Sequence, residues 1–288
     1  MKKEKRIWRV VDLLQWITKD FESKGIESSR LDAELILSYA LKLDRVQLYI
    51  NFDRPVIEEE LKIIRRLVTR RRRREPIAYI IGKKEFYSIE LKMEPGVFIP
   101  RPETEILVDT SLKYIKRGDK ILDIGIGSGA ISIALAKNIR DIKIIGIDIN
   151  EKACILAKEN IERYNLSDII EVRHISMERF FKESEEKFDI VVSNPPYVPT
   201  EEIKDLMPEI KDFEPREAID GGKDGISFIK KLIKGVKKIL KGEGRVIIEI
   251  GDGQLPLLKE ELKNSNFIIE EVSKDLAKKD RVIVIYHI

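Results

Sequence analysis

The residues best suited to chemistry are the tetrad Asn194-Pro195-Pro196-Tyr197, which directly follows the apolar run Phe188–Ser193. The Asn194 side-chain oxygen and the Pro195 backbone carbonyl can each accept a hydrogen bond from one N–H of a planar NH2 group. Such bonds shift electron density onto a nitrogen whose lone pair is otherwise delocalised. Proline adds no competing N–H, and the Tyr197 ring offers a flat face for stacking. The tetrad predicts a reaction at an amide or amino nitrogen, with Asn194, Pro195 and Tyr197 as catalytic residues and Pro196 as a further substrate contact.

A second candidate feature is the glycine-rich loop Gly125-Ile126-Gly127-Ser128-Gly129, which lies between a strand-like run and a helical one. Glycines at alternate positions allow sharp turns and let a ligand approach the peptide groups closely. Asp148 ends the next apolar run, about 20 residues further on, where an acidic residue can bond ribose hydroxyls. The G-x-G-x-G spacing favours S-adenosylmethionine over a nicotinamide dinucleotide, which requires G-x-G-x-x-G. With the tetrad, this loop predicts in-line methyl transfer in which positioning is the main catalytic effect.

The elements that must position these residues alternate between strand and helix. Helical segments such as Lys152–Tyr164 and Phe228–Leu240 lie between strand-like runs. This alternation is typical of a mostly parallel sheet that has helices on both faces and binds ligands at the carboxyl ends of its strands. The predicted strands are Lys120–Ile124, Ile142–Ile149, Ile169–Ile175, Phe188–Ser193, Gly244–Ile250, Phe267–Val272 and Arg281–Tyr286.

The first part of the chain differs, because its apolar residues recur at helical spacing and indicate a small helical domain. The period then changes. Phe86–Met93 has strand-like stretches, and Glu94-Pro95-Gly96 supplies a turn before Val97-Phe98-Ile99, which predicts a β-hairpin. The predicted domains are a helical substrate-recognition domain, a hairpin linker and a catalytic domain, over residues 1–81, 82–100 and 101–288.

Composition limits the classes of protein to consider. The 288 residues are 43% hydrophobic, and 54 basic residues nearly balance 51 acidic ones to give a net charge of +3. Nucleic-acid-binding proteins usually carry a strongly basic domain, so this balance argues against one. A single cysteine, Cys154, and two histidines argue against a disulfide or a metal centre. No apolar run reaches the roughly 18 residues of a membrane helix, so we expect a cytoplasmic protein with no membrane partner.

One basic cluster, Arg70–Arg74, lies at the end of a helical run. We favour a solvated helix end that interacts well with the helix dipole. Contact with an acidic face of a partner protein is the second interpretation, and RNA binding is the third.

With these residues in view, the chain resembles the HemK-type protein-(glutamine-N5) methyltransferases, which modify the glutamine of the Gly-Gly-Gln motif in bacterial class 1 peptide-chain release factors. The resemblance covers nearly the whole chain. Its most specific part is Phe98-Ile99-Pro100-Arg101-Pro102-Glu103-Thr104-Glu105, which DNA methyltransferases with the same tetrad lack. Further matching stretches are Ser29-Arg30-Leu31-Asp32-Ala33-Glu34, Glu75-Pro76-Ile77-Ala78-Tyr79-Ile80-Ile81-Gly82, Glu214-Pro215, Ala218, Asp220-Gly221-Gly222-Lys223-Asp224-Gly225 and Glu249-Ile250-Gly251.

The resemblance implies an α/β fold, a seven-stranded Rossmann-like class I methyltransferase sheet with a reversed last strand, a small N-terminal helical bundle and a linking β-hairpin. It implies S-adenosylmethionine as cofactor, a class 1 release factor as partner, and glutamine N5-methylation in support of translation termination. Ile126 replaces the family's usual threonine, and Ser176-Met177-Glu178 stands where the family often has an acidic-aromatic pair near the adenine. The cofactor-binding residues are then Phe98, Arg101, Thr104, Gly125, Ile126, Gly127, Ser128, Gly129, Asp148, Met177, Glu178 and Asn194.

Three alternatives remain. A nucleic-acid methyltransferase acting on adenine N6 or cytosine N4 would meet the same planar NH2 group, but it would have to flip its base and grip phosphates. The charge balance argues against it, so we expect no direct contact with nucleic acid. A ribosomal-protein glutamine N5-methyltransferase would use similar catalytic residues. A non-catalytic scaffold with the same fold is disfavoured by the intact glycine loop, Asp148 and tetrad.

Overall fold

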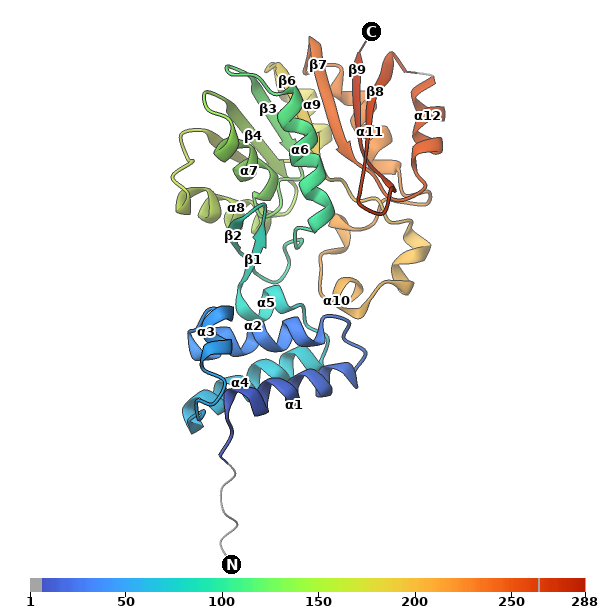
Figure 1. The fold of residues 1–288 in the computed structure, drawn as a ribbon. Helices are drawn as coiled ribbons and strands as arrows, with labels where there is room; N and C mark the ends of the chain where they lie inside the picture. Colours follow the sequence, from blue (N-terminus) through green and yellow to red (C-terminus); the bar gives the residue numbers. More distant parts are fainter. Residues whose placement is uncertain (1–6, 264, 288) are drawn as a thin grey trace, which may run out of the picture. The chain divides into compact units, whose positions relative to one another are not determined.

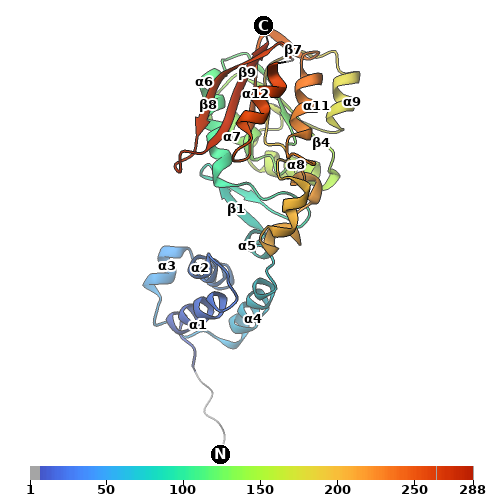
Figure 2. The same ribbon diagram turned by 90° about the vertical axis from the view of Figure 1, so that its right-hand side faces the viewer.

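The N-terminal unit is a bundle of α-helices. The computed structural model describes residues 7–263 and 265–287, and the chain divides into two compact units, Met1–Gly82 and Lys83–Ile288. The helices of the first unit are α1 (Val10–Glu22), α2 (Ser29–Leu41), α3 (Arg45–Ile50), α4 (Glu58–Arg72) and α5 (Ile77–Ile81). Helices α1 and α2 lie side by side (Figures 1 and 2). Apolar side chains from all five helices form one buried core, which includes Leu14, Ile36 and Leu67.

The arginine run at the end of α4 makes contacts within the N-terminal unit. Arg71 Nε donates to Asp32 Oδ2 on α2 over 2.7 Å, and both side chains are almost fully buried. The helix end is where we predicted it, but Arg71 is not solvated, because a buried carboxylate compensates its charge. Neighbouring arginines make similar contacts, which are Arg70 with Glu75, Arg72 with Asp20, and Arg74 with the backbone carbonyls of Lys24 and Gly25.

The β-hairpin turns earlier than predicted. Strands β1 (Lys83–Phe86) and β2 (Ile89–Lys92) pair antiparallel around Tyr87 and Ser88, whose φ angles are +51° and +58°. Positive φ at both positions suits a two-residue hairpin turn. Asparagine and glycine are the usual residues at such positions, so Tyr87 and Ser88 do not indicate a turn in the sequence. A turn does occur at Pro95-Gly96, yet residues 97–99 do not form the predicted strand.

The second unit contains a seven-stranded sheet, which confirms the predicted fold. Its order is β5-β4-β3-β6-β7-β9-β8, and the pairs that involve β9 are antiparallel whereas the other pairs are parallel. The central strands are buried on both faces, which explains their nearly continuous runs of Ile, Leu and Val. The strands are β3 (Lys120–Ile124), β4 (Lys143–Asp148), β5 (Ile170–His174), β6 (Phe188–Ser193), β7 (Leu240–Glu249), β8 (Phe267–Lys274) and β9 (Asp280–His287).

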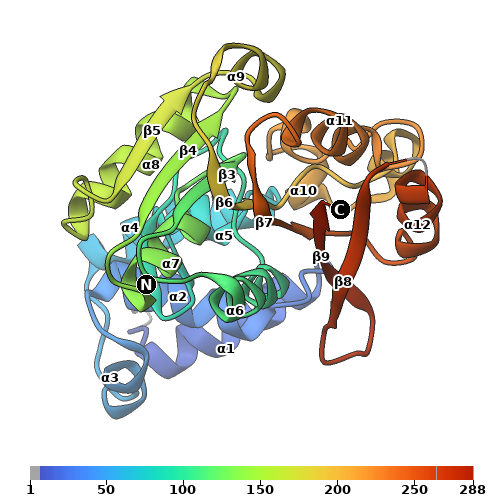
Figure 3. The same cartoon turned by 90° about the horizontal axis from the view of Figure 1, so that it is seen from above.

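Helices cover both faces of this sheet (Figure 3). One face carries α6 (Glu105–Tyr114), α7 (Ala130–Asn138) and α8 (Glu151–Arg163). The other carries α9 (Met177–Glu183), α11 (Ser227–Val236) and α12 (Leu255–Lys263), whose apolar side chains share one core with the strands. The connections contain η1 (Pro102–Thr104), η2 (Thr200–Asp205), α10 (Pro208–Lys211) and η3 (Arg216–Ala218). In the part of the chain that the structure describes, no helix has the length and apolar character needed to span a bilayer.

Candidate active site

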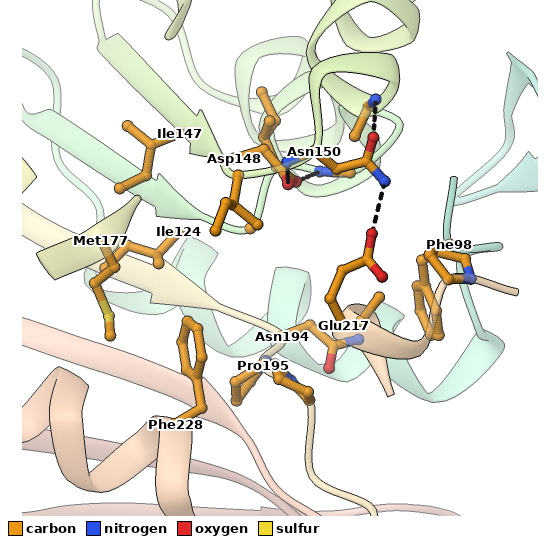
Figure 4. Close-up of a pocket in the computed structure, with 18 of the residues that line it drawn as sticks. Phe98, Ile124, Ile147, Asp148, Asn150, Met177, Asn194, Pro195, Glu217 and Phe228 are labelled. Atoms are coloured by element: carbon orange, nitrogen blue, oxygen red, sulfur yellow. Dashed lines mark hydrogen bonds between the residues drawn. The ribbon is translucent and has the colours of Figure 1, made fainter. Parts of the chain in front are cut away.

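A pocket lies at the carboxyl ends of β3, β4 and β6, where the strand order changes direction (Figure 4). It brings the glycine loop and the tetrad together, as the strand pattern predicted. Among the predicted substrate contacts, Asn194, Pro195 and Pro196 line it, whereas Tyr197 does not. The predicted cofactor residues on its wall are Phe98, Thr104, Gly125, Ile126, Gly127, Ser128, Asp148, Met177, Glu178 and Asn194.

The glycine loop is held by the neighbouring strand. The backbone N–H groups of Gly125 and Ile126 both donate to Ile147 O, over 2.9 and 3.0 Å. The φ angle of Gly125 is +81°, a region that favours glycine. A Cβ added at Gly125 would meet no atom within 4 Å, so a side chain there would project into the pocket. The loop therefore leaves its backbone at Gly125 uncovered by a side chain, so a ligand can approach it closely.

Two residues of the loop have packing roles. Ile126 lies against β4, where a Cβ added at Gly146 would come within 2.2 Å of Ile126 Cδ1. Gly129 is the N-cap of α7 at a φ of +86°, and a Cβ there would lie 3.2 Å from Ile133 Cδ1. Gly129 was predicted to contact the cofactor, but the structure places it at the helix entry and not on the pocket wall.

Asp148 ends β4 with its side chain at the pocket. Its Oδ2 accepts from Gly127 N over 2.9 Å, and its Oδ1 accepts from Asn150 N over 2.8 Å. Burial raises the pKa of this carboxyl, while the backbone hydrogen bonds oppose that effect. A carboxylate has about four lone-pair sites, so it can also accept from a ligand hydroxyl. Over residues 7–263 and 265–287, no group of three His, Cys, Asp or Glu side chains is arranged to hold a metal ion.

Asn194 directly follows β6 and lies beside Thr104. Its Nδ2 donates to Thr104 Oγ1 over 2.9 Å, which leaves Oδ1 as the side-chain atom that can accept from a substrate. The end of β6 is anchored by Ser193, whose hydroxyl donates to Ile124 O over 2.8 Å. This arrangement can present Asn194 Oδ1 and the Pro195 carbonyl to an NH2 group in the pocket.

Tyr197 is a tetrad residue that does not line the pocket. Burial, and then the charge of Glu249, raise the pKa of its hydroxyl. Gln254 Nε2 donates to its backbone carbonyl over 2.8 Å, which holds the loop from behind. The structure therefore gives Tyr197 a supporting position, and it does not show the predicted stacking surface for the acceptor.

Arg101, which is predicted to contact the cofactor, is not on the pocket wall. Its guanidinium pairs with the buried carboxylate of Glu214 and lies 4.9 Å from the centroid of the Phe98 ring. Glu214 Oε2 also accepts from Ile99 N over 3.2 Å. Burial raises the pKa of Glu214 and the Arg101 charge opposes this. Arg101 thus holds Phe98, which does line the pocket.

The sequence did not identify Asn150, Glu217 and Phe228, which also line the pocket (Figure 4). Asn150 Nδ2 donates to Gly96 O over 2.9 Å and to Glu217 Oε1 over 3.2 Å, so it joins three loops. The only sequence signal near Glu217 was the family resemblance at Glu214-Pro215 and Ala218, and that resemblance assigned these residues no role. The segment between β6 and α11 has only short helical turns, so periodicity gave no further information.

Asn160 is another functional candidate without a sequence signal. It is fully buried on α8, and its Nδ2 donates to Ser128 O over 2.9 Å and to Lys92 O over 3.1 Å. Its Oδ1 accepts from Lys92 N over 2.8 Å. Asn160 therefore connects the glycine loop to the hairpin.

Both units have relatives among known proteins. The family described as the PrmC N-terminal domain matches residues 12–82, and a methyltransferase domain family matches residues 115–286. The release factor glutamine methyltransferase of Geobacter sulfurreducens is 37% identical over 283 residues, which cover 98% of either chain. That of Thermodesulfovibrio yellowstonii is 41% identical over 258 residues, which cover 88% of this chain and 91% of its own.

Among solved structures, a methyltransferase from Pyrococcus furiosus has the same fold. Its TM-score is 0.54 at 19% identity, and the match covers 70% of this chain and 91% of that one. At this level of identity the likeness concerns the fold alone.

Proposed function

Since this chain belongs to the release factor glutamine methyltransferases, we propose that it methylates N5 of the glutamine in the Gly-Gly-Gln motif of class 1 release factors. The enzyme is an S-adenosylmethionine-dependent methyltransferase, and its acceptor is a release-factor glutamine. To this activity we add three details, which are the methylated atom N5, the Gly-Gly-Gln motif and class 1 of the release factors. The modification would support translation termination.

The observation that carries this proposal is the hydrogen bond from Asn194 Nδ2 to Thr104 Oγ1. A glutamine amide nitrogen is a poor nucleophile because its lone pair is delocalised into the carbonyl group. Asn194 Oδ1 and the Pro195 carbonyl would each accept a hydrogen bond from one of its two N–H groups. These hydrogen bonds increase the electron density on nitrogen and direct its lone pair towards the methyl group. Positioning of this kind supplies much of the rate enhancement in transfer reactions.

The pocket residues fit S-adenosylmethionine, which supplies an electrophilic methyl group on a sulfonium. Gly125 and Gly127 leave space beside their peptide groups, and Asp148 can accept from ribose hydroxyls. Met177 and Phe228 provide apolar surface for the planar base. Arg101 and Gly129 would act indirectly, through Phe98 and the start of α7.

The alternatives find less support. A nucleic-acid amino methyltransferase would need an extended basic surface, but the net charge is only +3. Four arginines of the run, Arg70, Arg71, Arg72 and Arg74, also make contacts inside the N-terminal unit. The relatives from Geobacter sulfurreducens and Thermodesulfovibrio yellowstonii are named for release factors and not for ribosomal proteins. These names do not favour a ribosomal-protein acceptor.

We expect label from methyl-labelled S-adenosylmethionine to appear on an intact release factor. A factor whose loop glutamine is replaced by alanine should stay unlabelled, and so should duplex DNA. Mass spectrometry of the labelled peptide should place the methyl group on the glutamine side-chain nitrogen. Label on the alanine variant, or on DNA alone, would overturn the assignment.

We further propose that the N-terminal unit recognises the folded release factor, since a short glutamine loop alone offers little specificity. Its exposed apolar residues, among them Val46 and Ile50 on α3, are of the kind found at protein interfaces. In the same assay, a short peptide that carries the glutamine loop should be methylated with a much lower kcat/KM than the whole factor. Equal values would argue against recognition outside the pocket.

Replacing Asp148 by Asn is expected to raise the Kd of S-adenosylmethionine roughly 10- to 100-fold, the cost of losing hydrogen bonds to a charged acceptor. The amide would also turn its NH2 group towards the N–H of either Gly127 or Asn150. Isothermal titration calorimetry measures the change. Asp168→Asn, at an exposed loop position, is the matched control. An unchanged Kd would show that Asp148 does not hold the cofactor.

A further inference from the structure

Asn160 is a buried amide that makes three hydrogen bonds to two other segments of its unit. It lies on α8 and is fully buried. Its Oδ1 accepts from Lys92 N on β2 over 2.8 Å. Its Nδ2 donates to Lys92 O over 3.1 Å and to Ser128 O, in the glycine loop, over 2.9 Å. Both N–H groups and the oxygen of the amide therefore have partners.

These partners allow the amide only one orientation. Lys92 N is a donor and can bond only to the amide oxygen, whereas Lys92 O and Ser128 O are acceptors and can bond only to the NH2 group. A turned amide would bring its oxygen against two carbonyl oxygens. Strand β2 is thus a fixed support from which Asn160 directs one N–H at the glycine loop.

The glycine loop needs such a support at Ser128. Its neighbours Gly127 and Gly129 have φ angles of +57° and +86°, and glycine adopts positive and negative φ with similar ease. Backbone preferences therefore do not hold the peptide group between Ser128 and Gly129 in one orientation. Its N–H donates to Ile126 O within the loop itself, whereas its carbonyl is bonded to Asn160 on α8. The second bond fixes this peptide group relative to the sheet and its helices.

The side chain of Ser128 is a buried hydroxyl group on the pocket wall. The residue is only 2% exposed, and its Oγ has no hydrogen-bond partner among the described residues. A buried polar group without a partner requires an explanation. A ligand in the pocket would provide one, by bonding to this hydroxyl.

The strand order indicates which part of the cofactor meets the hydroxyl. Asp148 at the end of β4 would hold the ribose, and the methyl group must reach Asn194 after β6. The glycine loop follows β3, which lies between these two strands. The cofactor's sulfur joins its ribose to the methyl group and to an amino-acid group, so this middle part would lie at the loop. The ammonium and the carboxylate of the amino-acid group can both bond to a hydroxyl.

We propose that Asn160 is a positioning residue, which acts through Ser128 to hold the glycine loop against the amino-acid group of S-adenosylmethionine. Asn160 itself is not on the pocket wall, and it lies 32 residues beyond Ser128 in the sequence. The inference rests on the cofactor of the proposed function and not on its acceptor.

The test is Asn160→Asp, with calorimetry of two ligands. Aspartate keeps the size of the side chain, but its second oxygen replaces Nδ2 and repels Ser128 O. S-adenosylhomocysteine carries the amino-acid group, whereas 5′-methylthioadenosine lacks it and keeps the base, the ribose and the sulfur. We expect the Kd of S-adenosylhomocysteine to rise about 10- to 100-fold, the effect of losing one hydrogen bond to a charged group. The Kd of 5′-methylthioadenosine should remain as in the wild type, which also shows that the variant is folded.

Two further variants and a control complete the measurement. Asn160→Ala removes the amide without adding a charge and should give the same difference between the two ligands. Ser128→Ala removes a hydroxyl that has no partner among the described residues, so it should keep the wild-type stability while S-adenosylhomocysteine binds about 10-fold more weakly. Asn165→Asp, at an exposed position just after α8, is the matched control and should bind both ligands normally.

An equal loss of affinity for both ligands in the Asn160 variants would overturn the proposal, because Asn160 would then support only the fold. Unchanged binding of S-adenosylhomocysteine by the Asn160 variants, or by Ser128→Ala, would overturn it as well. Failure of the proposed function is a distinct result. A release factor that stays unlabelled in the transfer assay would leave the difference between the two ligands unaffected, since no acceptor takes part in these binding measurements.

Discussion

Replacing Asn194 by Ala is expected to lower kcat for release-factor methylation by about 10²- to 10³-fold, the usual cost of removing one preorganised group that stabilises a transition state. The reason is that Oδ1 is the only side-chain acceptor of the tetrad on the pocket wall. Single-turnover kinetics with saturating cofactor measures the effect on the chemical step. The KM should change much less than kcat.

Two controls show that this loss is chemical. Asn138→Ala removes an amide that donates to Ala134 O over 2.9 Å outside the pocket, so it should leave kcat near the wild-type value. Calorimetry should find S-adenosylmethionine bound by Asn194→Ala with an affinity close to normal. A near-normal kcat in Asn194→Ala would contradict the mechanism, even if glutamine remained the acceptor.

The second large effect is expected at Gly221, which packs against the loop that follows the tetrad. A Cβ at this position would lie 2.5 Å from Gly225 O and 2.8 Å from Tyr197 Cα, and both are backbone atoms that cannot rotate away. Gly221 N also donates to Val198 O over 2.8 Å, so the two segments cannot separate freely. Gly221→Ala should therefore displace the tetrad.

We expect Gly221→Ala to lower kcat roughly 10²-fold, since a shift of about 1 Å at a reacting group can have that effect. Overpacking should also reduce the free energy of unfolding by about 1–3 kcal/mol. Steady-state kinetics and denaturant unfolding measure the two losses. Gly242→Ala is the matched control, because a Cβ at Gly242 meets no atom within 4 Å. Equal behaviour of the two variants would show that the packing behind the tetrad does not position it.

Much of the sheet could be predicted because its strands are buried on both faces. Strands β3 and β6 have the predicted bounds, because most of their residues are apolar and buried in the core. The positions of the glycine loop and the tetrad followed, because both come directly after parallel strands. The general location of the site could therefore be predicted from local sequence patterns alone.

The contacts that sequence patterns could not predict concern side chains whose partners are distant in sequence. Arg101 pairs with Glu214, which is more than a hundred residues away in the sequence. Tyr197 follows β6, and the charge of Glu249, which ends β7, affects its hydroxyl. The basic run predicts a solvated helix end, but Arg71 is buried against Asp32 on another helix. No periodicity or spacing reports such contacts. The hairpin turn is a different kind of error, because Tyr87 and Ser88 adopt a conformation that their residue types do not favour.

The close packing of Ile126 on Gly146 limits the order in which substitutions can accumulate at this site. Any side chain at position 146 would overlap the end of Ile126, as long as Ile126 keeps its length. A shorter residue at position 126, such as threonine, would remove the closest of these contacts, the one with Cδ1, although the Cβ of residue 126 would still lie 3.1 Å from a Cβ at position 146. The two positions are thus epistatic. A directed-evolution library that varies them singly would discard pairs that a joint library could recover.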